Sequence, residues 1–156
     1  MAGRTKGGPR YYSTGKSAQQ FVSEIMRLLG EFGASSFHVK QVKGQPVAIA
    51  FTIEADSGLL PFQIEPRFEG VRKRMSKARS AKAEPEAVAW AQARHLIELQ
   101  LEAVESGVVS VAQAFGGFAF LNTGRTVADM LEERTGELIA GEQLLLPTAK
   151  KEEKPC

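Results

Sequence analysis

The sequence Glu84–Ser106, EPEAVAWAQARHLIELQLEAVES, decides how the rest of the chain folds. At helical spacing four of its charged residues fall on one narrow line, and apolar residues fill most of the remaining circumference. The charged line consists of Arg94, Glu98, Glu102 and Glu105. A helix with so wide an apolar surface needs cover on two sides, so we expect it to lie in the middle of the core. Pro85 suits the first helical turn and Gly107 suits a left-handed stop.

Upstream of this helix the sequence first predicts an amphipathic helix and three strands. Ser17 and Gln20 form a capping box before an amphipathic helix that Gly33 ends. Alternation of apolar and polar residues then predicts strands over 36–42, 47–55 and 60–65, with turns between them. The strands form an antiparallel meander with one apolar face and one small or polar face. We expect helices to cover the apolar face only.

The basic segment before the long helix predicts a short helix over 67–77, followed by a mobile Ser/Ala/Lys segment. In this short helix Phe68, Val71 and Met75 share the side that we expect to face inward.

After the long helix, Ser110 and Gln113 predict another capping box before a short helical turn. Residues 118–121 have the length of a strand. Thr126 and Asp129 cap a last helix that runs to about Ile139.

These elements define the expected architecture. The fold class is α+β: a three-stranded antiparallel meander with helices packed on one face, an α-β-β-β-α-α core and a C-terminal strand–helix extension. Residues 1–15 read as a flexible basic arm, 16–147 as a single α+β domain and 148–156 as a disordered charged tail.

Bulk composition indicates an ordinary globular protein. With 156 residues, 43% hydrophobic and 24% charged, the chain has the size and balance of one domain with its own core. No apolar run approaches the roughly 20 residues of a membrane span, and no hydrophobic segment follows the N-terminal charges. Cys156 is the only cysteine, so no internal disulfide can form. We therefore expect a cytoplasmic protein with no membrane association.

Charge is segregated along the chain. The first sixteen residues carry four bases and no acid, and residues 66–82 carry seven bases against Glu69 alone. From residue 84 to 147 ten acids face three bases. Two basic segments ahead of a helix N-terminus could bind the backbone of a nucleic acid or the phosphates of a nucleotide. The alternative is that they form a solubilising linker, which has the same charges and binds no ligand. The predicted phosphate-binding residues are Lys6, Arg10, Arg72, Lys73, Arg74, Lys77, Arg79 and Lys82.

Other constellations do not support catalysis. Thr14-Gly15-Lys16-Ser17 resembles the end of a phosphate-binding loop, but Arg10 stands where that loop needs glycine. His38 and His95 are isolated, so they cannot supply a zinc site. We interpret the carboxylates of the long helix as a solvated polar face and not as an acid–base pair or a divalent-ion site. We therefore expect a non-enzyme with no cofactor and no metal.

Two resemblances extend this interpretation. The order α-β-β-β-α over residues 17–106, with Lys77-Ala-Arg-Ser-Ala-Lys82 before the long helix, resembles the double-stranded-RNA-binding domain in topology. A second set of motifs is similar to a family of small accessory proteins of tailed bacteriophages and mobile elements, over residues 11–140. These motifs are Lys16-Ser17, Leu28-Leu29, Gly33-Ala34, Phe51, Ala89-Trp90, residues 101–107 (LEAVESG) and residues 124–127 (GRTV). The second resemblance implies a phage accessory protein, which would act in the cytoplasm of the host cell, and brings no catalytic residues.

Three functional hypotheses follow from these patterns. The first is a phage-encoded accessory protein that binds nucleic-acid backbone phosphates, DNA or RNA, with low sequence specificity. The second is a counter-defence or host-takeover protein that binds a host protein or sequesters a nucleotide signal without catalysis. Its distinguishing feature would be a stable homo-oligomer whose interface pocket gathers Arg or Lys with an aromatic residue. The third is a structural part of the virion, for which no affinity for nucleotides or nucleic acids is expected.

Overall fold

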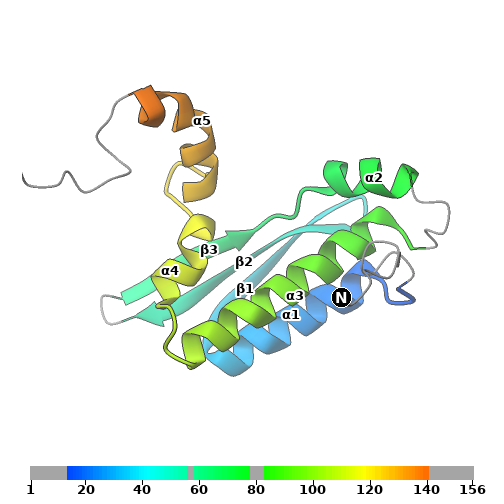
Figure 1. The fold of residues 1–156 in the computed structure, drawn as a ribbon. Coiled ribbons are helices and arrows are strands. Elements are labelled where there is room, and N and C mark those ends of the chain that lie inside the picture. Colours follow the sequence, from blue (N-terminus) through cyan, green and yellow to red (C-terminus); the bar gives the residue numbers. More distant parts are fainter. Residues whose placement is uncertain (1–13, 56–57, 78–82, 141–156) are drawn as a thin grey trace, which may run out of the picture.

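The computed structural model describes residues 14–55, 58–77 and 83–140, with only the backbone described at Ala55 and residues 136–140. In chain order the elements are α1 (Ala18–Phe32), β1 (Ala34–Val42), β2 (Gln45–Ala55), β3 (Gly58–Ile64), α2 (Phe68–Ser76), α3 (Pro85–Glu105), α4 (Val111–Phe115), the 3-10 turn η1 (Gly116–Phe118) and α5 (Val127–Ala140). Figure 1 shows α1 and α3 side by side across a three-stranded sheet. The predicted α+β fold is confirmed.

Helix α1 begins and ends where its sequence predicts. The Ser17 hydroxyl accepts a hydrogen bond from the backbone N–H of Gln20 at 3.3 Å. The Gln20 side chain in turn accepts one from the backbone N–H of Ser17 at 2.8 Å. These bonds satisfy two N–H groups that the helix itself cannot pair. Gly33 then adopts a left-handed φ of 113°, which ends the helix and turns the chain into β1.

The sheet is a meander in the order β1-β2-β3, with both pairs antiparallel. Val42 pairs with Gln45, so the first hairpin has a two-residue turn. Lys43 and Gly44 both have positive φ, 51° and 76°, as a turn matched to the twist of the strands requires. In β1 the register shifts between Ser35 and His38, and Ser36 has a φ of 53°. This bulge was not predicted, because alternation read along one strand carries no information about its partner.

A row of aromatic rings fills the centre of the core. Phe51 lies across from Phe62 in the β2–β3 register, with ring centroids 5.6 Å apart. Phe37 of β1 and Phe115 of α4 extend the row on either side, at 6.3 Å from Phe51 and 6.2 Å from Phe62. Because α1, α3 and α4 all contribute to the same cluster, the helices pack on one face of the sheet, as predicted.

Helix α3 is less enclosed than its sequence suggests. Trp90 is fully buried and donates a hydrogen bond from its indole N–H to the Pro46 carbonyl at 3.0 Å. On the other side α2 covers only the first turns, where Met75 packs against Val88. Farther along the helix Leu96 is 48% exposed and Leu99 is 51% exposed. The expectation of cover on two sides is therefore wrong for the middle of α3 within the described residues.

The C-terminal part keeps its predicted caps but not a regular strand. Ser110 and Gln113 form the expected capping box. The segment predicted as a strand over 118–121 begins in the 3-10 turn, and then makes one bridge from Ala119 to Phe62 and one from Phe120 to Thr126. Gly116-Gly117 and the turn at Gly124 leave too few residues between them for a ladder. Figure 1 shows α5 extending away from α1 and α3.

Candidate nucleic-acid interface

Helix α2 is amphipathic, as its sequence predicts. Met75 is buried against Val88 of α3, and Val71 and Ala83 pack around this pair. Phe68 joins the main core cluster. The basic residues lie on the opposite side of the helix, and two of them occupy its last turn, where cations interact favourably with the helix dipole. The packing therefore fixes which side of α2 faces solvent.

Three predicted phosphate-binding residues share that solvent side. Lys73, Arg74 and Lys77 are one and four positions apart, which places them within about a third of the helix circumference. All three are exposed. Within the described ranges none of them has an acidic partner within ion-pair distance. Three adjacent cations without a neutralising carboxylate make this side of α2 positively charged.

Arg72, the fourth predicted residue on α2, is already paired. Its guanidinium forms an ion pair with Glu86 of α3 and lies 4.0 Å from Glu69. Burial opposes the ionisation of Glu86. The hydrogen bonds that Glu86 accepts from Arg72 and from the backbone, together with the charge of Arg72, outweigh this effect, so the pKa of Glu86 lies below its ordinary value. Arg72 thus joins α2 to α3 and has less freedom to bind a phosphate than the other three cations.

The expected phosphate site at the start of α3 is not supported by its charges. The cap residue is Glu84, and Glu86 occupies the first turn. A carboxylate at this place already interacts with the helix dipole and repels a phosphate. The favourable part of the predicted interface is therefore the side of α2, and the end of α3 is not.

The first hairpin brings further cations to the same end of the molecule. Gln19 at the start of α1 donates a hydrogen bond to the Gly44 carbonyl at 3.3 Å, and Trp90 bonds Pro46 near the start of α3. The turn therefore lies beside the N-terminal ends of both helices. Lys40 and Lys43 at this hairpin are exposed. Figure 1 shows the turn on the side of the molecule where α2 lies. Sequence reasoning missed these two lysines because they are isolated along the chain.

The remaining predicted residues lie outside the described part of the chain. They are Lys6, Arg10, Arg79 and Lys82. The predicted arm over 1–15 falls outside it except for its last two residues, and the predicted tail falls wholly outside it. The mobile segment expected after the basic helix likewise lies mostly outside, at 78–82.

The other motifs of the sequence are in structural roles. Ser17 is a helix cap, and Lys16 forms an ion pair with Glu24, so neither is arranged as in a phosphate-binding loop. His38 is exposed on β1 and His95 is half-buried on α3. No group of three or more potential metal ligands occurs among the residues that the structure describes. Of the carboxylates on the polar face of α3, Glu98 lies 3.5 Å from Arg94.

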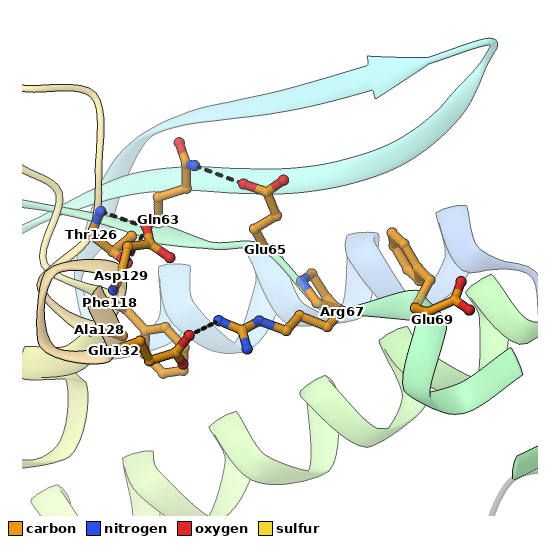
Figure 2. Close-up of a pocket in the computed structure, with 11 residues that line it drawn as sticks. Gln63, Glu65, Arg67, Glu69, Phe118, Thr126, Ala128, Asp129 and Glu132 are labelled. Atoms are coloured by element: carbon orange, nitrogen blue, oxygen red, sulfur yellow. Dashed lines mark hydrogen bonds and ion pairs between the residues drawn. The ribbon is translucent and has the colours of Figure 1, made fainter. Parts of the chain in front are cut away.

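A groove between β3 and α5 has a volume of about 640 Å³ (Figure 2). It is lined by Gln63, Glu65, Pro66, Arg67, Phe68, Glu69, Phe118, Thr126, Ala128, Asp129 and Glu132. Arg67 crosses it to Glu132 at 2.5 Å. Asp129 accepts hydrogen bonds from the backbone N–H and the hydroxyl of Thr126, and these bonds lower the pKa of Asp129.

The charge of this groove is unsuited to phosphate. Four carboxylates are among its lining residues, and the one cation among them is already paired with a carboxylate. A phosphate or a nucleotide would meet net negative charge there. Arg67 belongs to the basic segment of the sequence, yet it faces this acidic groove. The sequence contains no sign of that, because its partner Glu132 lies 65 residues away.

The comparisons with known proteins identify no relative: no family model, no curated protein and no solved structure matches this chain. The resemblances to phage accessory proteins and to the double-stranded-RNA-binding domain therefore stay hypotheses. None of the described helices has both the length and the apolar character needed to span a membrane. The class of protein that these findings define is an α+β domain with a basic helix at one end.

Proposed function

We propose that this protein is an accessory protein that binds the phosphate backbone of nucleic acid through the solvent side of α2. The observation that carries the proposal is the group of Lys73, Arg74 and Lys77, which are exposed on one side of a helix and have no acidic partner in the described residues. Packing of Met75 against Val88 holds that side outward. The two lysines of the neighbouring hairpin extend the positive surface.

Binding of this kind has low sequence specificity. Lysine and arginine side chains that contact phosphates position a nucleic acid without reading its bases. Reading of single-stranded bases needs aromatic side chains on an open sheet face. In the register of this sheet the outward positions hold Ser35, Thr52 and Pro61, and beside them His38, Ala50 and Gln63. Among the residues that the structure describes, this face supplies no aromatic platform, so the proposal rests on backbone contacts alone.

The test is a titration of labelled single- and double-stranded DNA and RNA at several salt concentrations. For duplex DNA, each phosphate contact contributes about 0.9 to the slope of log affinity against log salt. Replacing Arg74 and Lys77 by glutamine should weaken binding and lower the magnitude of that slope by about 2. Comparing the four nucleic acids identifies the preferred substrate.

A matched control removes the same charge elsewhere. Arg27 and Arg134 are exposed on α1 and α5, away from the basic end, and their replacement by glutamine also lowers the net charge by two. This control should leave the slope within about 0.5 of the wild-type value. Equal losses in the two variants would mean that only net charge matters, and the interface on α2 would be wrong. No binding at low salt would leave the host-protein and nucleotide-signal hypotheses to be tested next.

The alternative of a counter-defence protein that sequesters a nucleotide receives no support from the described cavities. The groove between β3 and α5 repels phosphate, because four carboxylates line it. A nucleotide pocket formed between two copies of the chain remains within that hypothesis. It predicts saturable binding of a free nucleotide, which the same titration measures when an unlabelled nucleotide is used as competitor.

A further inference from the structure

The solvent side of α3 carries an uncharged stripe of four residues, which we call the α3 stripe: Gln92, Leu96, Leu99 and Ala103. The two central leucines are 48% and 51% exposed, and the flanking Gln92 and Ala103 are half-buried. Positions separated by four, three and four residues lie on one face of a helix. The same spacing forms the contact seam of helices that pack along each other. Half of each leucine is thus available to a partner.

The α3 stripe is complementary to itself in the antiparallel direction. The spacing of its four residues is symmetric about a midpoint between Ile97 and Glu98. If a second α3 lies antiparallel with that midpoint shared, Leu96 faces the partner's Leu99, and Gln92 faces the partner's Ala103. The reciprocal contacts follow by symmetry, as a two-fold dimer requires of its surface.

The unlike residues at the two ends of the stripe fit this pairing. Ala103 is short, so the aliphatic stem of the partner's Gln92 can lie over it while the amide at its tip stays in solvent. A long side chain thus meets a short one at each end, and the two leucine pairs meet in the centre. In a parallel pair each residue meets its own copy, so two glutamines face each other at one end and two alanines leave a gap at the other.

Charge favours the antiparallel arrangement as well. The basic helix α2 packs at the N-terminal end of α3, where Met75 contacts Val88. The C-terminal end of α3 exposes Glu102 and Glu105. In the antiparallel pair Val88 lies opposite the partner's Gly107, so each α2 comes close to the acidic end of the partner's α3. Cations are favourable there, both for the carboxylates and for the helix dipole.

A parallel pair would have the opposite effect. It would bring together the two α2 helices, each with three cations that have no acidic partner in the described ranges, and would also bring the two acidic ends together. Like charges in contact disfavour an association. The length of α3 also fits the antiparallel pair, because the helix ends at Glu105, before it would meet the α2 of its partner.

We propose that the α3 stripe is the docking surface for a second copy of this chain, which binds antiparallel across a two-fold axis between Ile97 and Glu98. This interaction is distinct from the nucleic-acid binding proposed above, although the cations of α2 contribute to both. It requires no ligand, and the residues that carry it lie on α3.

The first test is the mass of the purified, nuclease-treated full chain by analytical ultracentrifugation, from low to high micromolar concentration. The wild type should sediment as a dimer at the upper end of that range. Leu99→Glu places a charge in the centre of the stripe and should weaken dimerisation by about tenfold or more. Leu131→Glu is the matched control, because Leu131 is also a helix-surface leucine with 50% exposure, and it should leave the dimer intact.

The second test determines the orientation and does not depend on a glutamate variant. With Cys156→Ser as background, so that no native thiol remains, Gln92→Cys and Ala103→Cys chains are oxidised separately and as a mixture. The antiparallel pair predicts a disulfide-linked dimer in the mixture and much less in either single variant, because only unlike positions come within disulfide distance.

Three results would overturn the proposal. A wild type that stays monomeric at high micromolar concentration would exclude the dimer. A dimer that Leu99→Glu and Leu131→Glu affect equally would lie on another surface. Disulfides between like positions in the single variants, without the mixed product, would show a parallel pair. Circular dichroism of each variant establishes that the fold is intact, so that a loss of the dimer is assigned to the surface.

Discussion

Trp90 is the side chain whose replacement tests the described core most directly. It is fully buried on α3, and its indole N–H donates to the Pro46 carbonyl at 3.0 Å. This bond joins the first half of α3 to the start of β2. Trp90→Phe keeps an aromatic ring in the core but removes both the donor and the second ring.

The expected loss of stability is the sum of three contributions. Loss of a buried hydrogen bond costs about 1 kcal/mol. Loss of the smaller ring removes roughly 50 Å² of buried apolar surface, or about 1 kcal/mol, and the cavity that it leaves adds about as much again. The free energy of unfolding should fall by about 2–3 kcal/mol in total. For a chain of this size that lowers the melting temperature by about 5–10 °C.

The assay is urea unfolding followed by far-UV circular dichroism at one protein concentration. Fluorescence cannot serve for both proteins, because Trp90 is the only tryptophan in the chain. Leu131→Ala is the control, since this side chain is half exposed and its loss should cost less than about 1 kcal/mol. If the free energy of unfolding of Trp90→Phe lay within about 0.5 kcal/mol of the wild-type value, both the burial of Trp90 and its hydrogen bond to Pro46 would be refuted.

Three further predictions concern stability and use the same unfolding assay. The hydrogen bond from Lys16 holds the pKa of Glu24 below its ordinary value. Glu24→Gln should therefore lower the free energy of unfolding by about 1 kcal/mol at neutral pH. This difference from wild type should vanish as pH falls through the lowered pKa, because the carboxylate is then protonated. An equal difference at all pH values would contradict this. Thr126→Ala removes the cap of α5 and should cost about 1 kcal/mol, with faster amide exchange in its first turn; unchanged exchange would count against the cap. Gly44→Ala should lower the free energy of unfolding by about 1 kcal/mol, because the backbone there has a φ of 76°. Gly70→Ala lies inside α2 with open space around it and should raise the free energy of unfolding by about 0.5 kcal/mol. If Gly70→Ala were the more destabilising of the two, both backbone assignments would be refuted.

Most of the fold could be predicted because the decisive interactions are local. The capping boxes at Ser17 and Ser110 and the cap at Thr126 each join residues three positions apart, so the sequence contains both partners. Alternation located the three strands for the same reason. The bulge at Ser36 could not be predicted, because it depends on how β1 pairs with β2.

The candidate site was predictable only in part. The composition of the basic segment indicated its cations, and the inward residues of α2 indicated its solvent side. Which cations are neutralised depends on distant acids: Arg67 meets Glu132, and Arg72 meets Glu86. Such pairs have no signature in the sequence of one chain. The same limit applies to the exposed middle of α3, because a helix that is apolar nearly all round does not reveal whether its own chain or a second copy covers it.

The two proposals together make a prediction that neither makes alone. In the antiparallel dimer the two α2 helices lie at opposite ends of the α3 pair, near Val88 and the partner's Val88. This separation is about 19 residues along the helix, or about 30 Å. One turn of duplex DNA spans about 34 Å, so a duplex of two turns can contact both helices at once, whereas a duplex of half a turn contacts one.

Simultaneous contact raises affinity through effective concentration without any new kind of contact. Leu99→Glu, which separates the copies, should therefore weaken binding of the two-turn duplex by about tenfold or more and leave binding of the half-turn duplex nearly unchanged. Leu131→Glu adds the same charge and should change both affinities equally. If Leu99→Glu also weakened both duplexes to the same extent as this control, the dimer would have no part in nucleic-acid binding, and α2 would act as a single site.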